Sequence, residues 1–125
     1  MKYSAAVLDR VRDPKYVGWL PRDAADVGTG EAGTLERGTV TRIQVRVGTA
    51  HRIDEAVFKV FGCSAAIASA SLVTERLRGA TVDEARGLES LAIVAELELP
   101  VERASVASLA VEAAKRAIED WERKR

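Results

Sequence analysis

The sequence predicts an α+β fold, in which helices pack over one face of a small three-stranded antiparallel sheet. Residues 39–47 and 53–61 are rich in β-branched side chains and alternate between apolar and polar residues, as half-buried strands do. Residues 106–121 carry apolar side chains at helical spacing, which predicts a long helix against the sheet. With 47% hydrophobic and 30% charged residues, a chain of 125 residues can bury one core, so we expect a single domain over residues 1–125.

The N-terminal part is predicted to be a short helix followed by a long loop. Ser4 can cap a helix that ends at Asp13, because the residue before a proline avoids helical angles. Residues 16–33 contain several glycines and no periodicity, which predicts a loop, and residues 34–36 are expected to form a short strand. A loop of this length is either functional or a mobile surface connection, and the sequence leaves both open.

The two alternating strands are joined by a turn and followed by a helix of small residues. Residues 48–51 fit a hairpin connection. After the second strand, apolar side chains recur on one helical face: Ala65, Ala68, Leu72, Val73 and Leu77. Ser64 is expected to cap this helix and Gly79 to end it in a left-handed conformation.

Three further helices are predicted in the C-terminal half. Thr81 and Glu84 form a capping box that starts a brief helix, broken near Gly87. A second helix starts at Ser90, and four of its side chains are expected to point inward: Leu91, Val94, Ala95 and Leu97. The final, long helix should close the open face of the sheet.

Composition disfavours several classes of function. The 19 lysines and arginines balance 19 aspartates and glutamates, so no net charge attracts the protein to nucleic acid or to an acidic membrane surface. A single cysteine forms no internal disulfide, and the N-terminus lacks an apolar run long enough for a signal peptide or membrane span, so we expect a cytoplasmic protein. The sequence contains no phosphate-binding glycine motif and no Ser/His/Asp order, so no motif predicts an enzyme active site.

The single cysteine, Cys63, is the main candidate for chemistry. It lies beside the N-terminus of the predicted helix, where unpaired N–H groups and the helix dipole favour a thiolate. The alternative is an inert small hydrophobic residue. His51 is expected in the turn at the far end of the second strand, where it is solvated and too distant to join Cys63.

Several stretches resemble one known family. Residues 58–71, with the sequence FKVFGCSAAIASAS, resemble the second cysteine motif of the IscU/NifU-type iron-sulfur cluster assembly scaffolds. The resemblance extends over nearly the whole chain, including Tyr3 and Ser4 and residues 13–18, 26–30 and 96–100. It implies the α+β fold of that family and a loop, residues 16–33, that approaches the cluster-binding end. It also implies a site at which three cysteines, an aspartate and often a histidine hold a cluster or zinc.

In this chain most of those ligand positions are substituted. Aligning the resemblance places Arg37 at the first cysteine, Thr39 at the aspartate, Ser105 at the histidine and Val106 at the third cysteine. Zinc and iron-sulfur clusters need about four thiolate, imidazole or carboxylate ligands. We therefore expect no cofactor on the monomer, a degenerate metal site with Cys63 as the residual ligand, and stability that does not depend on metal. Arg37 either forms a surface ion pair or holds the anionic sulfur of a persulfide or a partner's carboxylate.

Three functions remain open on this basis. The first is a divergent scaffold-like protein that acts as an interaction or regulatory module in iron-sulfur assembly, with a cysteine desulfurase or other assembly proteins as partners. The second is a sulfur carrier that accepts a persulfide on Cys63. The third is a homodimer that shares a cluster, to which each chain contributes Cys63 and external thiols complete the ligand set. Residues 101–103 depart from the family segment that recruits chaperones, although Arg103 keeps its positive charge.

Overall fold

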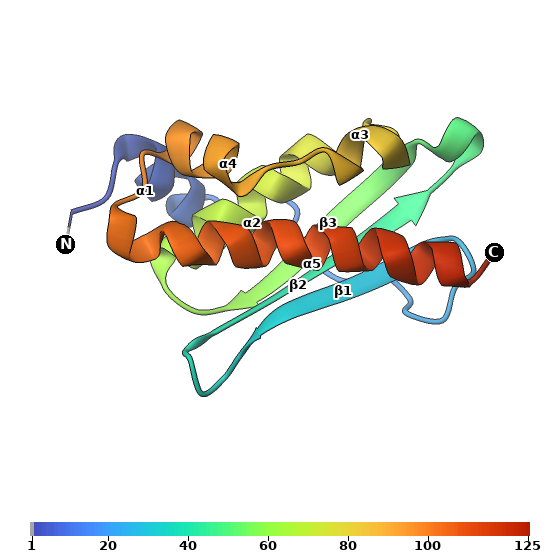
Figure 1. Ribbon diagram of the computed structural model, residues 1–125, viewed down its shortest axis with the longest axis horizontal. Helices are drawn as coiled ribbons and strands as arrows, with labels where there is room; N and C mark the ends of the chain where they lie inside the picture. Colours follow the sequence, from blue (N-terminus) through green and yellow to red (C-terminus); the bar gives the residue numbers. More distant parts are fainter. Residues whose placement is uncertain (1) are drawn as a thin grey trace.

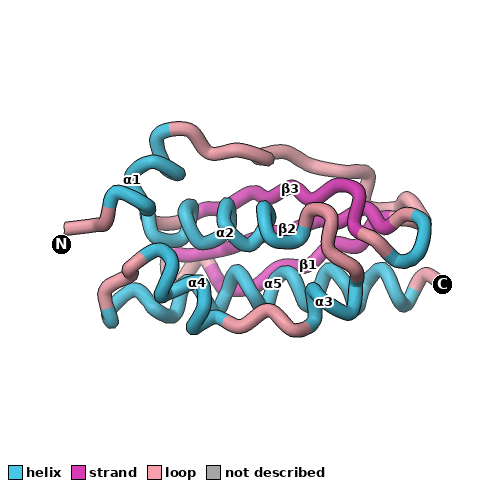
Figure 2. Tube along the Cα trace, turned by 90° about the horizontal axis from the view of Figure 1, so that it is seen from above, coloured by secondary structure: helices cyan, strands magenta, loops and turns pink. Residues whose placement is uncertain are grey.

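Three antiparallel strands in the order β1-β2-β3 form the centre of the computed structural model, which describes residues 2–125. The elements follow one another as α1 (Ala5–Arg12), β1 (Val27–Thr34), β2 (Thr39–Val47), η1 (Thr49–His51), β3 (Ile53–Phe61), α2 (Ser64–Leu77), α3 (Val82–Arg86), α4 (Ser90–Leu97), η2 (Val101–Arg103) and α5 (Ala104–Arg123). Helices α2 and α5 lie side by side on one face of the sheet, and α3 and α4 lie beyond them (Figure 1 and Figure 2). The predicted α+β architecture with an antiparallel three-stranded sheet is confirmed.

Helix α5 packs directly on the backbone of strand β1, and two glycines make this approach possible. A Cβ added at Gly30 would lie 2.1 Å from the carbonyl oxygen of Ala113, and one at Gly28 would lie 1.9 Å from that of Ala117. No real Cβ atom sits so close to a carbonyl oxygen, so any side chain would push the helix away from the sheet. These glycines therefore serve a helix-sheet contact and do not mark a loop.

The predicted loop over residues 16–33 is thus wrong in its second half. Residues 27–34 form β1, which pairs with β2 from Val27 opposite Arg46 to Thr34 opposite Thr39. Of the strand expected at residues 34–36, Thr34 is the last residue of β1, whereas residues 35–36 lie in the turn between β1 and β2. The alternation that would reveal β1 is missing from the sequence because the positions facing α5 are glycines.

The core lies between the sheet and the helices. Its largest side chains with less than 2% exposure are Phe58, Ile43, Ile53, Leu72, Leu77, Ile93, Leu97 and Ile118. Helix α4 contributes Ile93 and Leu97 to this core, so the expected inward position of Leu97 is confirmed. Leu91 is 75% exposed and Ala95 is also exposed, so the prediction is wrong for these two residues. Val94 is partly buried, as expected.

Most predicted helix ends are confirmed. The hydroxyl of Ser4 accepts the N–H of Val7, and the capping box of Thr81 and Glu84 is formed in both directions. Gly79 has a φ of 80°, the left-handed conformation expected after α2. The N-cap of α2 is Cys63 and not Ser64, so this boundary differs from the prediction by one residue.

Residues 14–26, the crossing segment, run from α1 along the outer edge of β3 and onto the sheet face opposite the helices (Figure 2). Phe58 pairs with this segment: its N–H donates to the carbonyl of Tyr16 at 3.0 Å and its carbonyl accepts the N–H of Gly18 at 3.1 Å. The guanidinium of Arg78 stacks over the Tyr16 ring, 3.8 Å from the ring centroid. The edge strand β3 is thereby partly covered by the chain itself.

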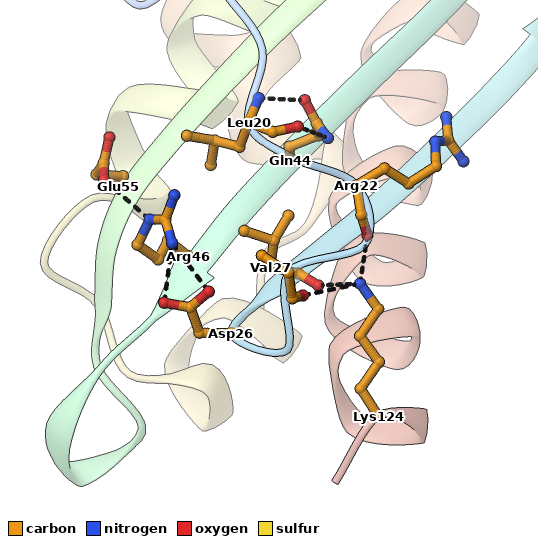
Figure 3. Close-up of polar contacts among 9 residues, drawn as sticks. Leu20, Arg22, Asp26, Val27, Gln44, Arg46, Glu55 and Lys124 are labelled. Atoms are coloured by element: carbon orange, nitrogen blue, oxygen red, sulfur yellow. Dashed lines mark hydrogen bonds and ion pairs between the residues drawn. The ribbon is translucent and has the colours of Figure 1, made fainter.

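Buried and charged side chains fix the second half of the crossing segment (Figure 3). The amide of Gln44 accepts the N–H of Leu20 and donates to its carbonyl, both at 2.8 Å. Arg46 donates to both carboxylate oxygens of Asp26 at 2.9 Å. From the end of α5, Lys124 donates to the carbonyls of Arg22, Ala24 and Val27 at 2.5, 3.1 and 2.7 Å. No helix within residues 2–125 has the length and apolar character needed to cross a lipid bilayer.

Candidate functional site

A cavity of about 750 Å³, the Cys63 cavity, lies where the turn between β1 and β2, the link from β3 to α2 and the beginning of α5 meet. These three segments lie at the same end of the molecule in Figure 1. The cavity brings together the five residues singled out in the sequence: Arg37, Thr39, Cys63, Ser105 and Val106. The roles of these residues stay predictions, but their common location follows the arrangement that the resemblance implies.

Cys63 occupies the N-cap position of α2 and is partly buried. Its carbonyl accepts the N–H groups of Ala66 and Ile67 at 3.0 and 3.1 Å, which begins the helix. Its side chain forms no capping hydrogen bond, so the sulfur is not engaged by the N–H groups of the first turn. The thiol is free, and it lines the cavity.

Arg37 lies in the turn between β1 and β2 and is exposed. Its backbone N–H donates to the carbonyl of Thr34 at 3.2 Å, and the turn closes through Gly38, whose φ of 85° favours glycine. Within residues 2–125 no carboxylate comes within ion-pair distance of the Arg37 guanidinium. Of the two alternatives for Arg37, the intramolecular surface pair is therefore not formed.

The other substituted positions differ in burial. Thr39 is 8% exposed and Val106 is 7% exposed, whereas Ser105 is exposed. Thr39 packs against Gly62, where an added Cβ would lie 3.2 Å from the threonine hydroxyl oxygen. Val106 belongs to the hydrophobic core. Burial of its isopropyl group stabilises the fold by about 25 cal/mol per Å² of apolar surface removed from water.

Arg103 belongs to this cavity, although the sequence analysis did not include it among the site residues. Its Nε donates to the hydroxyl of Tyr3 at 3.3 Å. The hydrogen bond that Arg103 donates to Tyr3 is the main cause that raises the pKa of Arg103, and electrostatic interactions with Tyr3 and Cys63 add to it. The sequence did contain a signal for Arg103: it is a cation three residues before Val106, at the start of the same helix.

The crossing segment does not reach the cavity, contrary to what the resemblance implies for the loop. Among residues 16–33 only Gly33, at the end of β1, lines it. His51 lies at the other end of β3, exposed, with its ring edge-on to Trp121 at 5.3 Å between centroids. The sequence-based separation of His51 from Cys63 is therefore confirmed by the strand that lies between them.

The donor set of the cavity does not fit a cluster or zinc ion held by one chain. Residues 2–125 bring no three His, Cys, Asp or Glu side chains close enough together to hold a metal ion. A protonated guanidinium has no lone pair to donate, and a valine has no donor atom. The cavity supplies one thiol where a cluster requires about four ligands.

The sequence matches the family described as NifU-like N terminal domain over residues 2–125. It is 42% identical over 125 residues to the iron-sulfur cluster assembly scaffold protein IscU of Rickettsia prowazekii, covering 100% of this chain and 95% of that protein. It is 40% identical to the protein of the same name from Azotobacter vinelandii, covering 100% of this chain and 98% of the relative. The structure superposes on the N-terminal part of a nitrogen-fixing NifU-like protein from Brucella abortus with a TM-score of 0.75 at 18% identity, over 98% of this chain and 95% of the other. The chain belongs to the family of NifU-like N-terminal domains.

Proposed function

We propose that this protein is a divergent, scaffold-like component of iron-sulfur cluster assembly, an interaction or regulatory module that does not hold a cluster on its own chain. The proposal is supported by relatives named as assembly scaffolds at about 40% identity over the full chain. The observation that carries it is the cavity itself, in which Cys63 is the single sulfur donor while Arg37 and Val106 stand at the two other cysteine positions of the family resemblance.

The proposed partners are proteins that handle sulfur or iron, with a cysteine desulfurase as the first candidate, and the proposed compartment is the cytoplasm. Such a module would bind through the surface it shares with scaffolds and would have no turnover of its own. Binding energy in interfaces comes mainly from a few apolar and arginine side chains, so a partner surface can persist after ligand residues are lost. Affinity for a desulfurase should therefore survive Cys63→Ala.

Reconstitution without air tests the missing ligand set. The purified protein is incubated with iron and sulfide, and the absorption spectrum and the iron content per chain are measured. We expect no stoichiometric cluster in the parent protein and a gain of iron in the double variant Arg37→Cys/Val106→Cys, which restores two thiols. One tightly held cluster or zinc ion per parent monomer, lost on Cys63→Ala, would sink the proposal.

A second candidate function is a persulfide carrier, favoured by the partly exposed Cys63 thiol beside Arg103. The Cys63 thiolate would attack the terminal sulfur of a donor protein's persulfide, its S–S bond would break, and the donor cysteine would leave as a thiolate. Cys63 then carries the sulfane sulfur, and no outside oxidant is required. Intact mass after incubation with a desulfurase and free cysteine should show one added sulfur that a reductant removes.

A homodimer that shares a cluster through two copies of Cys63 is the remaining alternative. It predicts half a cluster per chain and a cluster-dependent change in molecular mass. Sedimentation of the reconstituted protein separates it from the other two candidates, because neither of those requires assembly of two chains around metal.

A further inference from the structure

The side-chain charge of the Cys63 cavity is not balanced. Three guanidinium groups line it, from Arg37, Arg103 and Arg116, against one carboxylate, from Glu102. Arg116 pairs with Glu112 in the next helical turn. Neither Arg37 nor Arg103 forms an ion pair within residues 2–125. The chain as a whole has equal numbers of cations and anions, so the excess positive charge is local to this cavity.

Thr39 also contributes a hydroxyl to the lining of this cavity, and the residue is 8% exposed. A threonine hydroxyl can donate a hydrogen bond to a ligand that carries an acceptor oxygen.

Two helices begin at the cavity without a side-chain cap. The N-cap residues of α2 and α5, Cys63 and Arg103, form no capping hydrogen bond, and neither helix has an acidic residue in its first turn. At the start of α5 the preceding turn η2 already pairs the N–H of Ala104 with the carbonyl of Val101. At α2 the first N–H groups lack intrahelical partners, and the helix dipole makes that end positive. Both properties favour an anion, as in phosphate sites of other folds.

We propose that the Cys63 cavity binds a small oxyanion, with a phosphate, sulfate or carboxylate group held between Arg37, Arg103, the Thr39 hydroxyl and the N-terminus of α2. The inference rests on the proposed function, because a cavity that holds no cluster is free for another ligand. Arginine suits this role, since its planar fork matches the geometry of such groups. A volume of about 750 Å³ accommodates a small metabolite that carries the group as well as the free ion.

Cys63 serves as a reporter, because it is the chain's only cysteine and lines the cavity. Its alkylation by neutral iodoacetamide is timed in phosphate, sulfate or succinate, each against sodium chloride at equal ionic strength. We expect saturable protection by at least one of the three oxyanions. Arg37→Gln and Arg103→Gln should each raise the half-protecting concentration about tenfold, the lower end for a hydrogen bond to a charged group.

Arg123→Gln is the matched control, because it removes the same charge from the opposite end of α5. Its protection curve should match that of the parent. Protection only by phosphate or sulfate identifies a tetrahedral anion as the ligand class, and protection only by succinate identifies a carboxylate. Equal alkylation rates in all salts, or protection that both cavity variants retain, would overturn the proposal.

Amide chemical shifts of the parent protein provide a measurement that does not depend on the variants. Phosphate, sulfate or succinate should shift the Ser64 and Ala65 amides with the same half-saturation as the protection from alkylation. The absence of any such shift with all three contradicts the proposal even where a variant fails to fold. A parent protein that binds stoichiometric metal through Cys63 instead refutes the proposed function, whereas a metal-free parent that ignores all oxyanions refutes only this inference.

Discussion

The two ends of helix α5 are built in opposite ways. At its N-terminal end, the Cys63 cavity is lined by cationic side chains, among them Arg37, which forms no ion pair within residues 2–125. At its C-terminal end, Asp120 accepts the backbone N–H of Thr29 at 2.9 Å and Lys124 donates to three carbonyls. The hydrogen bonds that join α5 to β1 and to the crossing segment thus lie away from the site. We therefore expect substitutions in the Cys63 cavity to change its chemistry without loss of the fold.

The C-terminal end of α5 also shows how the crossing segment is held. Gln44 satisfies both backbone groups of Leu20 and donates to the hydroxyl of Thr29 at 2.9 Å. Gln44 is 3% exposed, so its amide forms hydrogen bonds with protein groups in place of water. Buried polar groups that are fully paired specify one arrangement of the chain.

Gly30→Ala should have the largest effect on stability, because it disrupts the packing of α5 on β1 between the two ends of the helix. The new Cβ would lie 2.1 Å from the Ala113 carbonyl oxygen and 2.4 Å from the Ala117 nitrogen, and backbone atoms cannot rotate away. We expect a loss of about 3 kcal/mol or more in the free energy of unfolding, measured by urea denaturation.

Gly18→Ala is the control for this substitution. It lies in the crossing segment, where the nearest atom to an added Cβ is a Val57 methyl at 3.8 Å. Its effect should be close to neutral. Equal losses in the two variants would contradict the close approach of helix and sheet as the cause.

Gln44→Leu should have the next largest effect, since it keeps the volume of the side chain but removes the amide. The N–H and carbonyl of Leu20 and the hydroxyl of Thr29 would lose their partner in a buried site. We expect a loss of about 2 kcal/mol in urea denaturation, together with faster amide exchange at Leu20.

Arg42→Gln, from the same face of β2, is the matched control for Gln44→Leu. Its guanidinium forms no ion pair within residues 2–125. Its replacement should therefore lower the free energy of unfolding by much less than Gln44→Leu does. If Gln44→Leu left both stability and exchange at Leu20 unchanged, the crossing segment would have to be held by other contacts.

Lys124→Met should cost about 1 kcal/mol, because it removes a charged donor from three carbonyls at a partly exposed position. Proteolysis within residues 21–25 should become faster, since Arg22 and Ala24 lose their link to α5. Arg123→Gln, which is more exposed on the same helical turn, provides the comparison and should not change the cleavage rate. A cleavage rate unchanged in Lys124→Met would mean that this lysine does not restrain the segment.

The sequence predicts the parts of this fold that are encoded locally. The bounds of β2 and β3 agree with the alternation at residues 39–47 and 53–61, and the capping box at Thr81 marks the start of α3. Strand β1 escaped prediction because Gly28 and Gly30 have no side chain to alternate. Their role depends on α5, which is remote in the sequence.

The candidate site was predictable in its members and less so in its setting. The residues at the ligand positions of the resemblance, from Arg37 to Val106, do share one cavity. Arg103 was not among the predicted site residues, because its contact with Tyr3 joins residues that are 100 positions apart in the sequence. The course of the crossing segment was missed for the same reason, since the pairing of Gln44 with the Leu20 backbone is set by tertiary structure alone.

The smallest effect is expected from Cys63→Ala and from metal removal. The Cys63 side chain forms no capping bond and is partly exposed, so its loss should change the free energy of unfolding by less than about 1 kcal/mol. Val106→Ala at the same cavity should cost more, about 1.5 kcal/mol, because it removes buried methyl groups from the core. A chelator should leave the melting temperature of the parent unchanged. The contacts that we expect to secure the fold involve no metal: the packing of α5 on Gly28 and Gly30, and the hydrogen bonds of Gln44 and Lys124. A melting temperature that falls with chelator in the parent but not in Cys63→Ala would show that metal at the cavity supports the fold, and the contrast between the two ends of α5 would be lost.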